Sequence, residues 1–297
     1  MKNNEEKLVV YRGMYENSPE ITKITVEDGM VEIGENAFRD YTYLKEVTIP
    51  KSVKYISACA FMGCEALTRV NFSDGLVEIG DEAFCSCNSL TGVRLPDSVS
   101  RIGEGCFEAC VSLTDLRLSE SVIAIGSGAF QYCFNLTHVI IPDSCVLVEF
   151  SAFSNCFSLE SIKLSENMTI IDDCTFLGCR SLVSVDLPAR LRRIGRQAFK
   201  GCSKLTQLII PILTETIGID AFAECASLGR IALPKHLSDI EECEIFSACD
   251  SLTDITFGGT DEEYASLTRG RSITVHRSDN TFFTPKVTIL NIEDKVK

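Results

Sequence analysis

Residues Leu90 to Leu113 read Leu-Thr-Gly-Val-Arg-Leu-Pro-Asp-Ser-Val-Ser-Arg-Ile-Gly-Glu-Gly-Cys-Phe-Glu-Ala-Cys-Val-Ser-Leu, and this unit recurs along almost the whole chain. One phenylalanine marks each copy, at Phe38, Phe61, Phe84, Phe107, Phe130, Phe153, Phe176, Phe199, Phe222 and Phe246, so eight of the nine intervals are 23 residues and the last is 24. A fixed period of this length predicts a solenoid, in which each copy forms one turn stacked on the next. We expect ten turns over residues 21–257, between an N-terminal cap at 1–20 and a C-terminal cap at 258–297.

Each part of the unit has its own pattern. The Leu-x-x-Val-x-Leu segment alternates as a short strand with one buried face does, so stacked copies should build a parallel sheet. The glycine that ends the Val-x-x-Ile-Gly segment is expected to turn the chain with a positive φ. It occurs at Gly80, Gly103, Gly126, Gly195 and Gly218. In Ala-Phe-x-x-Cys, the Phe and Cys spacing predicts a short helical turn at each corner.

Length and charge restrict the partners. The chain has 297 residues, with 42 acidic against 28 basic side chains and a formal charge of −14. This balance argues against a nucleic-acid partner or attraction to anionic lipid. The apolar run Leu8 to Tyr11 is too short for a secretory signal, and no apolar span approaches the ~20 residues that a membrane helix needs. We therefore expect no signal peptide and no membrane insertion.

The cysteines predict core positions. Nine of the fifteen follow a marker phenylalanine by three residues, at Cys64, Cys87, Cys110, Cys133, Cys156, Cys179, Cys202, Cys225 and Cys249. Parallel side chains on neighbouring turns leave the Cβ atoms near 4.8 Å, outside the ~3.5–4.5 Å of a disulfide. Buried free thiols are therefore expected on this ladder, and a reducing compartment fits them. The off-ladder cysteines are expected to be partly exposed: Cys59, Cys85, Cys106, Cys145, Cys174 and Cys243.

A zinc site is the alternative interpretation of the cysteines. Cys85-x-Cys87 and Cys106-x3-Cys110 have ligand-like spacing, but the second member of each pair is a core anchor and no histidine lies near either pair in the repeat. The sequence therefore predicts no metal and no cofactor.

The repeat resembles a known family. Leu67-x-x-Val70-x-Phe72 and its counterparts match the strand of leucine-rich repeats, and the Ile-Pro-x-x-Val-x-x-Ile-Gly-x-x-Ala-Phe-x-x-Cys remainder is similar to the BspA-like subclass over roughly residues 21–267. The resemblance implies a right-handed solenoid with a parallel sheet on its concave face and no catalytic residues. It also implies bacterial or protist surface proteins that attach to host or matrix proteins. It thus favours a cell-surface or secreted location, whereas the N-terminus and the free thiols favour the cytoplasm.

Side chains that flank the inward strand residues face outward and form a basic stripe across the middle copies: Arg69, Arg94, Arg117, His138, Ile140 and Lys163. The stripe is either a solvated face or a docking surface for an acidic protein, in which Arg94 and Arg117 bind carboxylates and Ile140 supplies an apolar contact. A second basic patch comprises Arg190, Arg192, Arg193, Arg196 and Lys200, with Lys204 nearby. It indicates local solubility or an anionic contact.

Carboxylates also recur at the 23-residue spacing, just after the strands, at Asp74, Asp97, Glu120, Asp143 and Glu166. They either hydrogen-bond turn amides or share calcium ions. We favour the turn amides.

The sequence favours a non-catalytic, adhesion-like protein–protein interaction module that uses the concave face of the solenoid. One alternative is a structural or self-assembly scaffold. The other is a serine hydrolase, because Asp115, His138 and Ser161 fall on successive copies in the order that a triad needs. The oligomeric state and the identity of the partner are left open.

Overall fold

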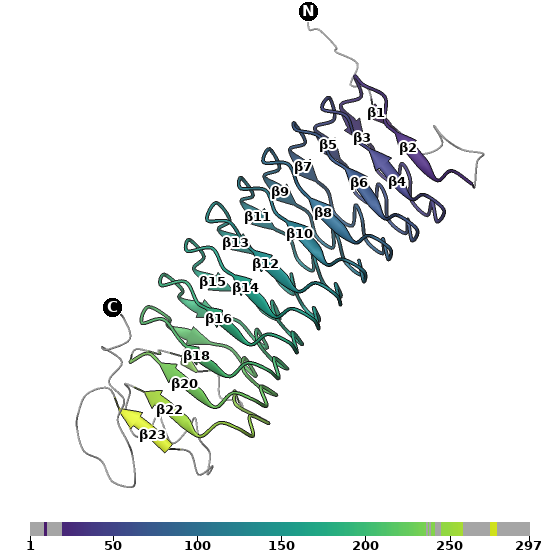
Figure 1. The fold of residues 1–297 in the computed structure, drawn as a ribbon. Helices are drawn as coiled ribbons and strands as arrows, with labels where there is room; N and C mark the ends of the chain where they lie inside the picture. The colour runs from purple at the N-terminus through teal and green to yellow at the C-terminus, as the bar shows by residue number, and fades with distance from the viewer. Residues whose placement is uncertain are drawn as a thin grey trace, which may run out of the picture.

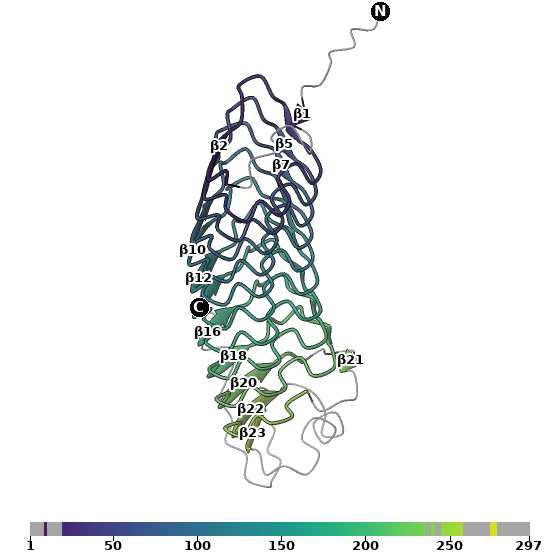
Figure 2. The same cartoon turned by 90° about the vertical axis from the view of Figure 1, so that its right-hand side faces the viewer.

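The computed structural model describes residues 9–10, 20–235, 237, 239–240, 245–257 and 274–277. The chain winds as an elongated solenoid in which one repeat makes one turn (Figure 1). Its parallel strands form two rows along the solenoid, one made of four successive sheets and the other of two, and Figure 2 shows the two rows on opposite sides of the interior. The predicted parallel-strand solenoid is confirmed.

The row with the longer strands, here called the wide sheet, contains the Leu-x-x-Val-x-Leu segments. Its strands are β2 (Lys23–Thr25), β4 (Glu46–Thr48), β6 (Arg69–Asn71), β8 (Gly92–Arg94), β10 (Asp115–Arg117), β12 (His138–Ile140), β14 (Ser161–Lys163), β16 (Ser184–Asp186), β18 (Gln207–Ile209), β20 (Arg230–Leu233), β22 (Asp254–Phe257) and β23 (Thr274–Arg277). Register partners are one repeat apart, as in Val93 beside Leu116. The central residue of each three-residue strand faces the core, so its two neighbours face outward.

The opposite row, here called the narrow sheet, contains the Val-x-x-Ile segments. Its strands are β1 (Val9–Val10), β3 (Glu32–Ile33), β5 (Tyr55–Ile56), β7 (Glu78–Ile79), β9 (Arg101–Ile102), β11 (Ala124–Ile125), β13 (Leu147–Val148), β15 (Ile170–Ile171), β17 (Arg193–Ile194), β19 (Thr216–Ile217) and β21 (Asp239–Ile240). β1 pairs with β3, as expected for a strand that covers the first turn. The second residue of each described pair is buried, so the residues before it line the outer surface.

The corners differ from the prediction, because the structure assigns no helix to any described residue. Two residues with positive φ flank each marker phenylalanine from Phe38 to Phe222, at the second position before and after it, as Gly105 (φ 55°) and Ala109 (φ 56°) flank Phe107. This conformation interrupts a helix. It also turns alternate N–H groups toward the next turn, where Gly105, Phe107 and Ala109 donate to the carbonyls of Ser127, Ala129 and Gln131 at 2.8 Å. The corners are therefore hydrogen-bonded turns. Among the described residues, no helix is long and apolar enough to cross a membrane.

The expected positive φ of the repeated glycines is wrong. Gly80, Gly103, Gly126, Gly195 and Gly218 all lie outside the left-handed region. Glycine is needed at these positions because the backbones of successive turns approach each other closely. A Cβ on Gly103 would lie 2.5 Å from the carbonyl carbon of Gly80 in the preceding turn. Stacking one turn on the next is therefore what demands a residue without a side chain.

A column of aromatic rings fills the interior. The ten marker phenylalanines are buried, and neighbouring rings stack with centroids 5.0–6.0 Å apart and interplanar angles of 2–25°. Leucine, isoleucine and valine from both sheets pack around this column in one continuous core. The flat faces of every interior turn are thus covered by its neighbours.

Some predictions fall outside the described residues. These are most of the N-terminal cap, Cys243, residues 241–244 of the segment 241–246 in which the extra residue is expected, and the C-terminal cap apart from β23. The stack resumes after the extra residue, because Phe222 donates its N–H to the carbonyl of Ile245 and stacks on Phe246.

Candidate protein-binding surface

The predicted basic stripe lies on the outer face of the wide sheet. Ladder pairing places Arg69 beside Glu46, Arg94 beside Arg117, and Ile140 beside Lys163. His138 lies on the same strand as Ile140, with its side chain also exposed. The structure therefore brings these residues onto one face in the order that the repeat predicted.

Acidic neighbours partly neutralise the two central arginines. Arg94 Nη2 lies 2.6 Å from Asp115 Oδ2 in the next turn, and Arg117 Nη2 lies 3.5 Å from Asp97 Oδ1 in the preceding turn. Both guanidinium side chains remain more than half exposed, at 69% and 56%. Exposed pairs of this kind are weak, so an incoming carboxylate can compete for either arginine.

Ile140 is the apolar centre of this face. Its side chain is 65% exposed, although its strand neighbour Val139 is buried. Cationic Lys163 lies beside it on the next strand, and Arg117 occupies the equivalent position one turn earlier. An exposed apolar side chain inside a polar rim is the usual arrangement of a protein-binding surface.

The triad arrangement is incomplete. His138 Nδ1 and Ser161 Oγ are joined by a 2.9 Å hydrogen bond, as their neighbouring positions predicted. In a hydrolytic triad, however, Nε2 contacts the serine and Nδ1 contacts the carboxylate. Here Ser161 is hydrogen-bonded to Nδ1, so this nitrogen is not available to a carboxylate. The predicted acid, Asp115, is paired with Arg94 instead.

The line of carboxylates caps turns. Asp143 Oδ1 accepts the backbone N–H of Glu166 at 3.0 Å, and Asp97 Oδ1 accepts that of Glu120 at 3.4 Å. Asp97 and Asp143 therefore each hold the turn of the following repeat, which is the interpretation favoured by the sequence.

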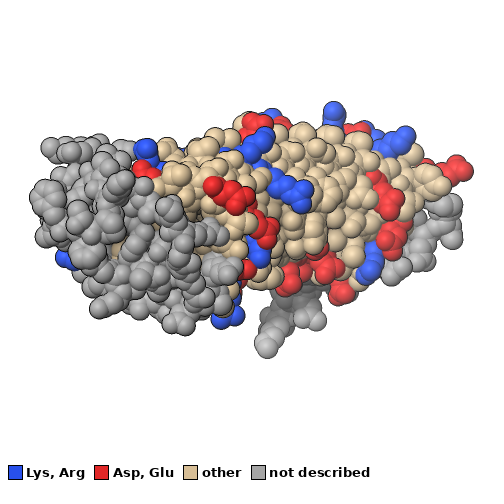
Figure 3. Space-filling model, turned by 90° about the horizontal axis from the view of Figure 1, so that it is seen from below, with Lys and Arg blue, Asp and Glu red and all other residues tan. Residues whose placement is uncertain are grey.

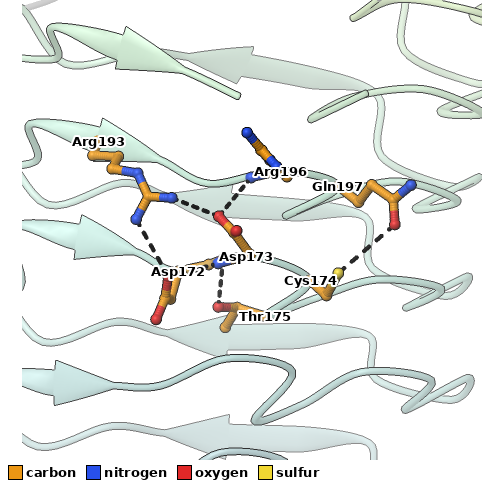
Figure 4. A network of polar contacts seen from close by, with 7 residues as sticks. All are labelled: Asp172, Asp173, Cys174, Thr175, Arg193, Arg196 and Gln197. Carbon is orange, nitrogen blue, oxygen red and sulfur yellow. Dashed lines mark hydrogen bonds and ion pairs between the residues drawn. The ribbon is translucent and has the colours of Figure 1, made fainter. Parts of the chain in front are cut away.

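The second basic patch is surrounded by acids that the sequence places far away. Arg193 contacts Asp172 at 3.3 Å and Asp173 at 2.6 Å, and the Asp173 carboxylate also accepts the backbone N–H of Arg196 (Figure 4). Arg192 pairs with Glu215 at 2.5 Å. Lys200 contacts Asp220 at 2.9 Å, and this hydrogen bond raises the pKa of the lysine. Stacking thus supplies the counter-charges that the local segment lacks.

Opposite charges alternate elsewhere too. On the face seen in Figure 3, basic and acidic side chains lie among each other and are separated by uncharged surface. The surface charge of this face therefore has no single sign.

The thiols are mostly inaccessible. All described cysteines are free, and the nine ladder cysteines are buried as predicted. The expectation of exposure holds for Cys59 and Cys174, which are half-buried, but is wrong for Cys85, Cys106 and Cys145. Burial raises the pKa of Cys64 and Cys179 to about 12 and that of Cys145 to about 11.

A signal for two of these buried thiols was present in the sequence. Cys106 occupies the position of the buried alanine that precedes the marker phenylalanine in other repeats, as Ala129 does. Cys145 occupies the first inward position of the narrow-sheet segment, as Val122 does in the turn before it. The repeat positions of Cys106 and Cys145 therefore indicate that both lie in the core.

Comparison with known families agrees with this architecture. The family model described as BspA type leucine rich repeat region matches residues 9–137 and 147–266. The chain belongs to the BspA-type leucine-rich-repeat family. Membership supports an interaction or surface repeat module, and proteins of this family are typically non-catalytic. No curated protein matches the sequence.

Several solved bacterial structures are similar to this BspA-type chain. The pneumococcal vaccine antigen PcpA is 18% identical, with a TM-score of 0.51 over 92% of this chain and 87% of PcpA. A leucine-rich repeat protein from Bacteroides ovatus is 22% identical, with a TM-score of 0.49 over 87% of this chain and 92% of that one. The leucine-rich repeat protein of T. pallidum is 26% identical, with a TM-score of 0.46 over 70% and 78%. At this level the likeness to PcpA concerns the fold.

Proposed function

We propose that this protein binds a protein partner through the outer face of the wide sheet, without catalysis. The observation that carries the proposal is Ile140, which is 65% exposed beside Lys163 and one turn from Arg117. Burial of such a side chain provides binding energy, while the surrounding cations select an acidic surface.

The wide sheet suits this role because its strands are held by hydrogen bonds and packing within the chain and do not depend on a partner for their structure. Ladder bonds and the stacked core fix each strand, so the outward residues vary without cost to the fold. A rigid array of such residues binds with little loss of conformational entropy. An adhesion-like role, with a host or matrix protein as the ligand, is the finer form of this proposal.

The test is quantitative affinity capture from host-cell and matrix extracts. The baits are the native chain, the Arg94→Glu/Arg117→Glu variant and the Ile140→Asp variant. The matched control is Arg190→Glu/Lys204→Glu, which makes the same charge change at exposed positions outside the wide-sheet strands. All four proteins should melt at similar temperatures, since changes at exposed sites alter stability little.

We expect a protein that is retained by the native chain and the control and is lost with both wide-sheet variants. Equal capture by all four baits would exclude the wide sheet as the binding surface.

A further inference from the structure

The outer face of the narrow sheet carries an apolar patch that the wide-sheet proposal does not use. Its members are Ile123, Val146, Leu147 and Ile170, which are 54%, 52%, 41% and 41% exposed. They lie in or directly before β11, β13 and β15, and Phe150, 51% exposed, extends the patch on the turn of β13. The buried residues of these strands face the core instead, so this patch contributes little to the packing of its own chain.

Charged residues border the patch at both ends. Toward the N-terminus lie Glu78, which pairs with Arg101 at 2.9 Å, and then Lys54. Toward the C-terminus lie Arg193 and then Glu215. An apolar centre with charged ends is typical of an interface.

We propose that this patch is the interface of a homodimer in which two solenoids pack antiparallel, with the two-fold axis along the strand direction between β11 and β13. Such an axis places β11 on β13 of the second copy, β9 on β15, β7 on β17 and β5 on β19. Each contact then occurs twice, as closed two-fold symmetry requires.

The charges select this register. Glu78 on β7 faces Arg193 on β17 of the second copy, and Lys54 before β5 faces Glu215 before β19. In the centre, Ile123 faces Val146 of the second copy. Arg101 meets Ile170 through its aliphatic stem while its head group stays with Glu78. Both contacts are therefore between opposite signs, and Glu78, Arg193 and Glu215 also keep ion pairs within their own chain, with Arg101, with Asp172 and Asp173, and with Arg192.

Other face-to-face registers lose this match. A parallel dimer places each strand on its own counterpart, so Arg101 faces Arg101 and Arg193 faces Arg193. An antiparallel dimer with its axis through β13 places Arg101 on Arg193. Like charges in contact oppose both arrangements.

The test is the mass of the full chain in solution, by sedimentation equilibrium, from roughly 1 µM to 1 mM, a range that brackets weak interfaces. The native protein should pass from monomer to dimer. Leu147→Asp should remain monomeric throughout, whereas Ile212→Asp, at a 73% exposed site in the turn after β18, should dimerise as the native protein does. Unchanged melting temperatures show that both variants fold.

A mixing experiment tests the register. Lys54→Glu and Glu215→Lys each create two like-charge contacts in their own homodimer, so each protein alone should dimerise at least tenfold more weakly. In an equimolar mixture the two substituted side chains face each other, and the two native ones do as well, so the heterodimer should regain native affinity.

A native chain that stays monomeric at all concentrations overturns the proposal, and the patch then belongs to a different partner. A dimer that persists in Leu147→Asp, or a mixture that dimerises no better than its components, also overturns it.

Discussion

Cys110 Sγ donates a hydrogen bond to the backbone carbonyl of Phe84, in the preceding turn, at 3.3 Å. The same carbonyl accepts the backbone N–H of Cys87 within its own turn at 3.2 Å. This bond from thiol to carbonyl recurs at all nine ladder cysteines, with distances of 3.0–3.3 Å. Each ladder cysteine thus packs as a small apolar side chain and also joins two turns through a weak donor.

The buried thiols predict a loss of stability at alkaline pH. Burial raises the pKa of the Cys110 thiol far above the ~8.5 of an unfolded cysteine. At pH values above ~8.5, the thiols of the unfolded chain lose their protons while those of the folded chain keep them, so the free energy of unfolding falls as pH rises. Each such thiol lowers the free energy of unfolding by about 1.4 kcal/mol per pH unit, and the contributions of the ladder cysteines add up. Denaturant midpoints measured from pH 7 to 10 should therefore be flat at first and fall steeply above about 8.5.

The matched variant for this prediction is Cys110→Ala. It should unfold with one fewer proton released at pH 10, as potentiometry of the unfolding reaction would show. A midpoint that stays level across this range would contradict protonated thiols in the core.

The aromatic column predicts a large cost for Phe107→Ala. The ring is fully buried and stacks on Phe84 at 5.3 Å and on Phe130 at 5.5 Å, so removing it leaves a cavity between two turns. Truncations of this kind cost ~3–5 kcal/mol, whereas Phe107→Leu keeps most of the volume and should cost clearly less. Equilibrium denaturation compares the two. Equal stabilities would show that the column is not packed as described.

Close stacking predicts opposite outcomes for two glycines in the same repeat. An alanine Cβ at Gly103 would lie 2.5–2.6 Å from the backbone of Gly80 and Asp81, so Gly103→Ala must push two turns apart. We expect a cost of about 1–3 kcal/mol. At Gly92 the nearest atoms would be 3.8 Å away, so Gly92→Ala should change stability by less than about 0.5 kcal/mol. Thermal melts of the pair test this, and a Gly103→Ala protein as stable as native would contradict the contact.

Turn capping predicts that the carboxylate line acts without calcium. Asp143 Oδ1 accepts the Glu166 amide at 3.0 Å, so Asp143→Ala should lower stability by about 1 kcal/mol. Asp143→Asn keeps an acceptor oxygen and should restore most of the loss. The melting temperature should be the same in calcium and in chelator; a rise with calcium that Asp143→Ala abolishes would favour the metal instead.

The repeat period was sufficient to predict the stacking order, the inward residues and the rows on the wide sheet. Each of these follows from position within the unit, as the pairing of Arg94 with Arg117 shows. The corners could not be predicted in the same way. The Ala-Phe-x-x-Cys spacing fits a helical turn, but the inter-turn bonds of Phe107 and Ala109 select alternating left-handed residues.

Contacts between turns account for the remaining differences. The role of Gly103 depends on the backbone of Gly80, which lies one repeat away in the sequence and in contact in the fold. Likewise, Arg193 reaches Asp172 and Asp173 of the preceding turn, although residues 187–214 around it contain no acidic side chain. Such contacts are visible in the sequence only when it is written one repeat beneath another.

The most direct test of the central claim is the dissociation constant of the captured partner, measured by calorimetry for native protein and for Arg94→Glu/Arg117→Glu. If the wide sheet is the binding surface, the double charge reversal should weaken binding by about a hundredfold, because two cationic contacts become repulsive. The melting temperature and the affinity of the Arg190→Glu/Lys204→Glu control should stay at native values. A dissociation constant unchanged by the reversal would contradict the account.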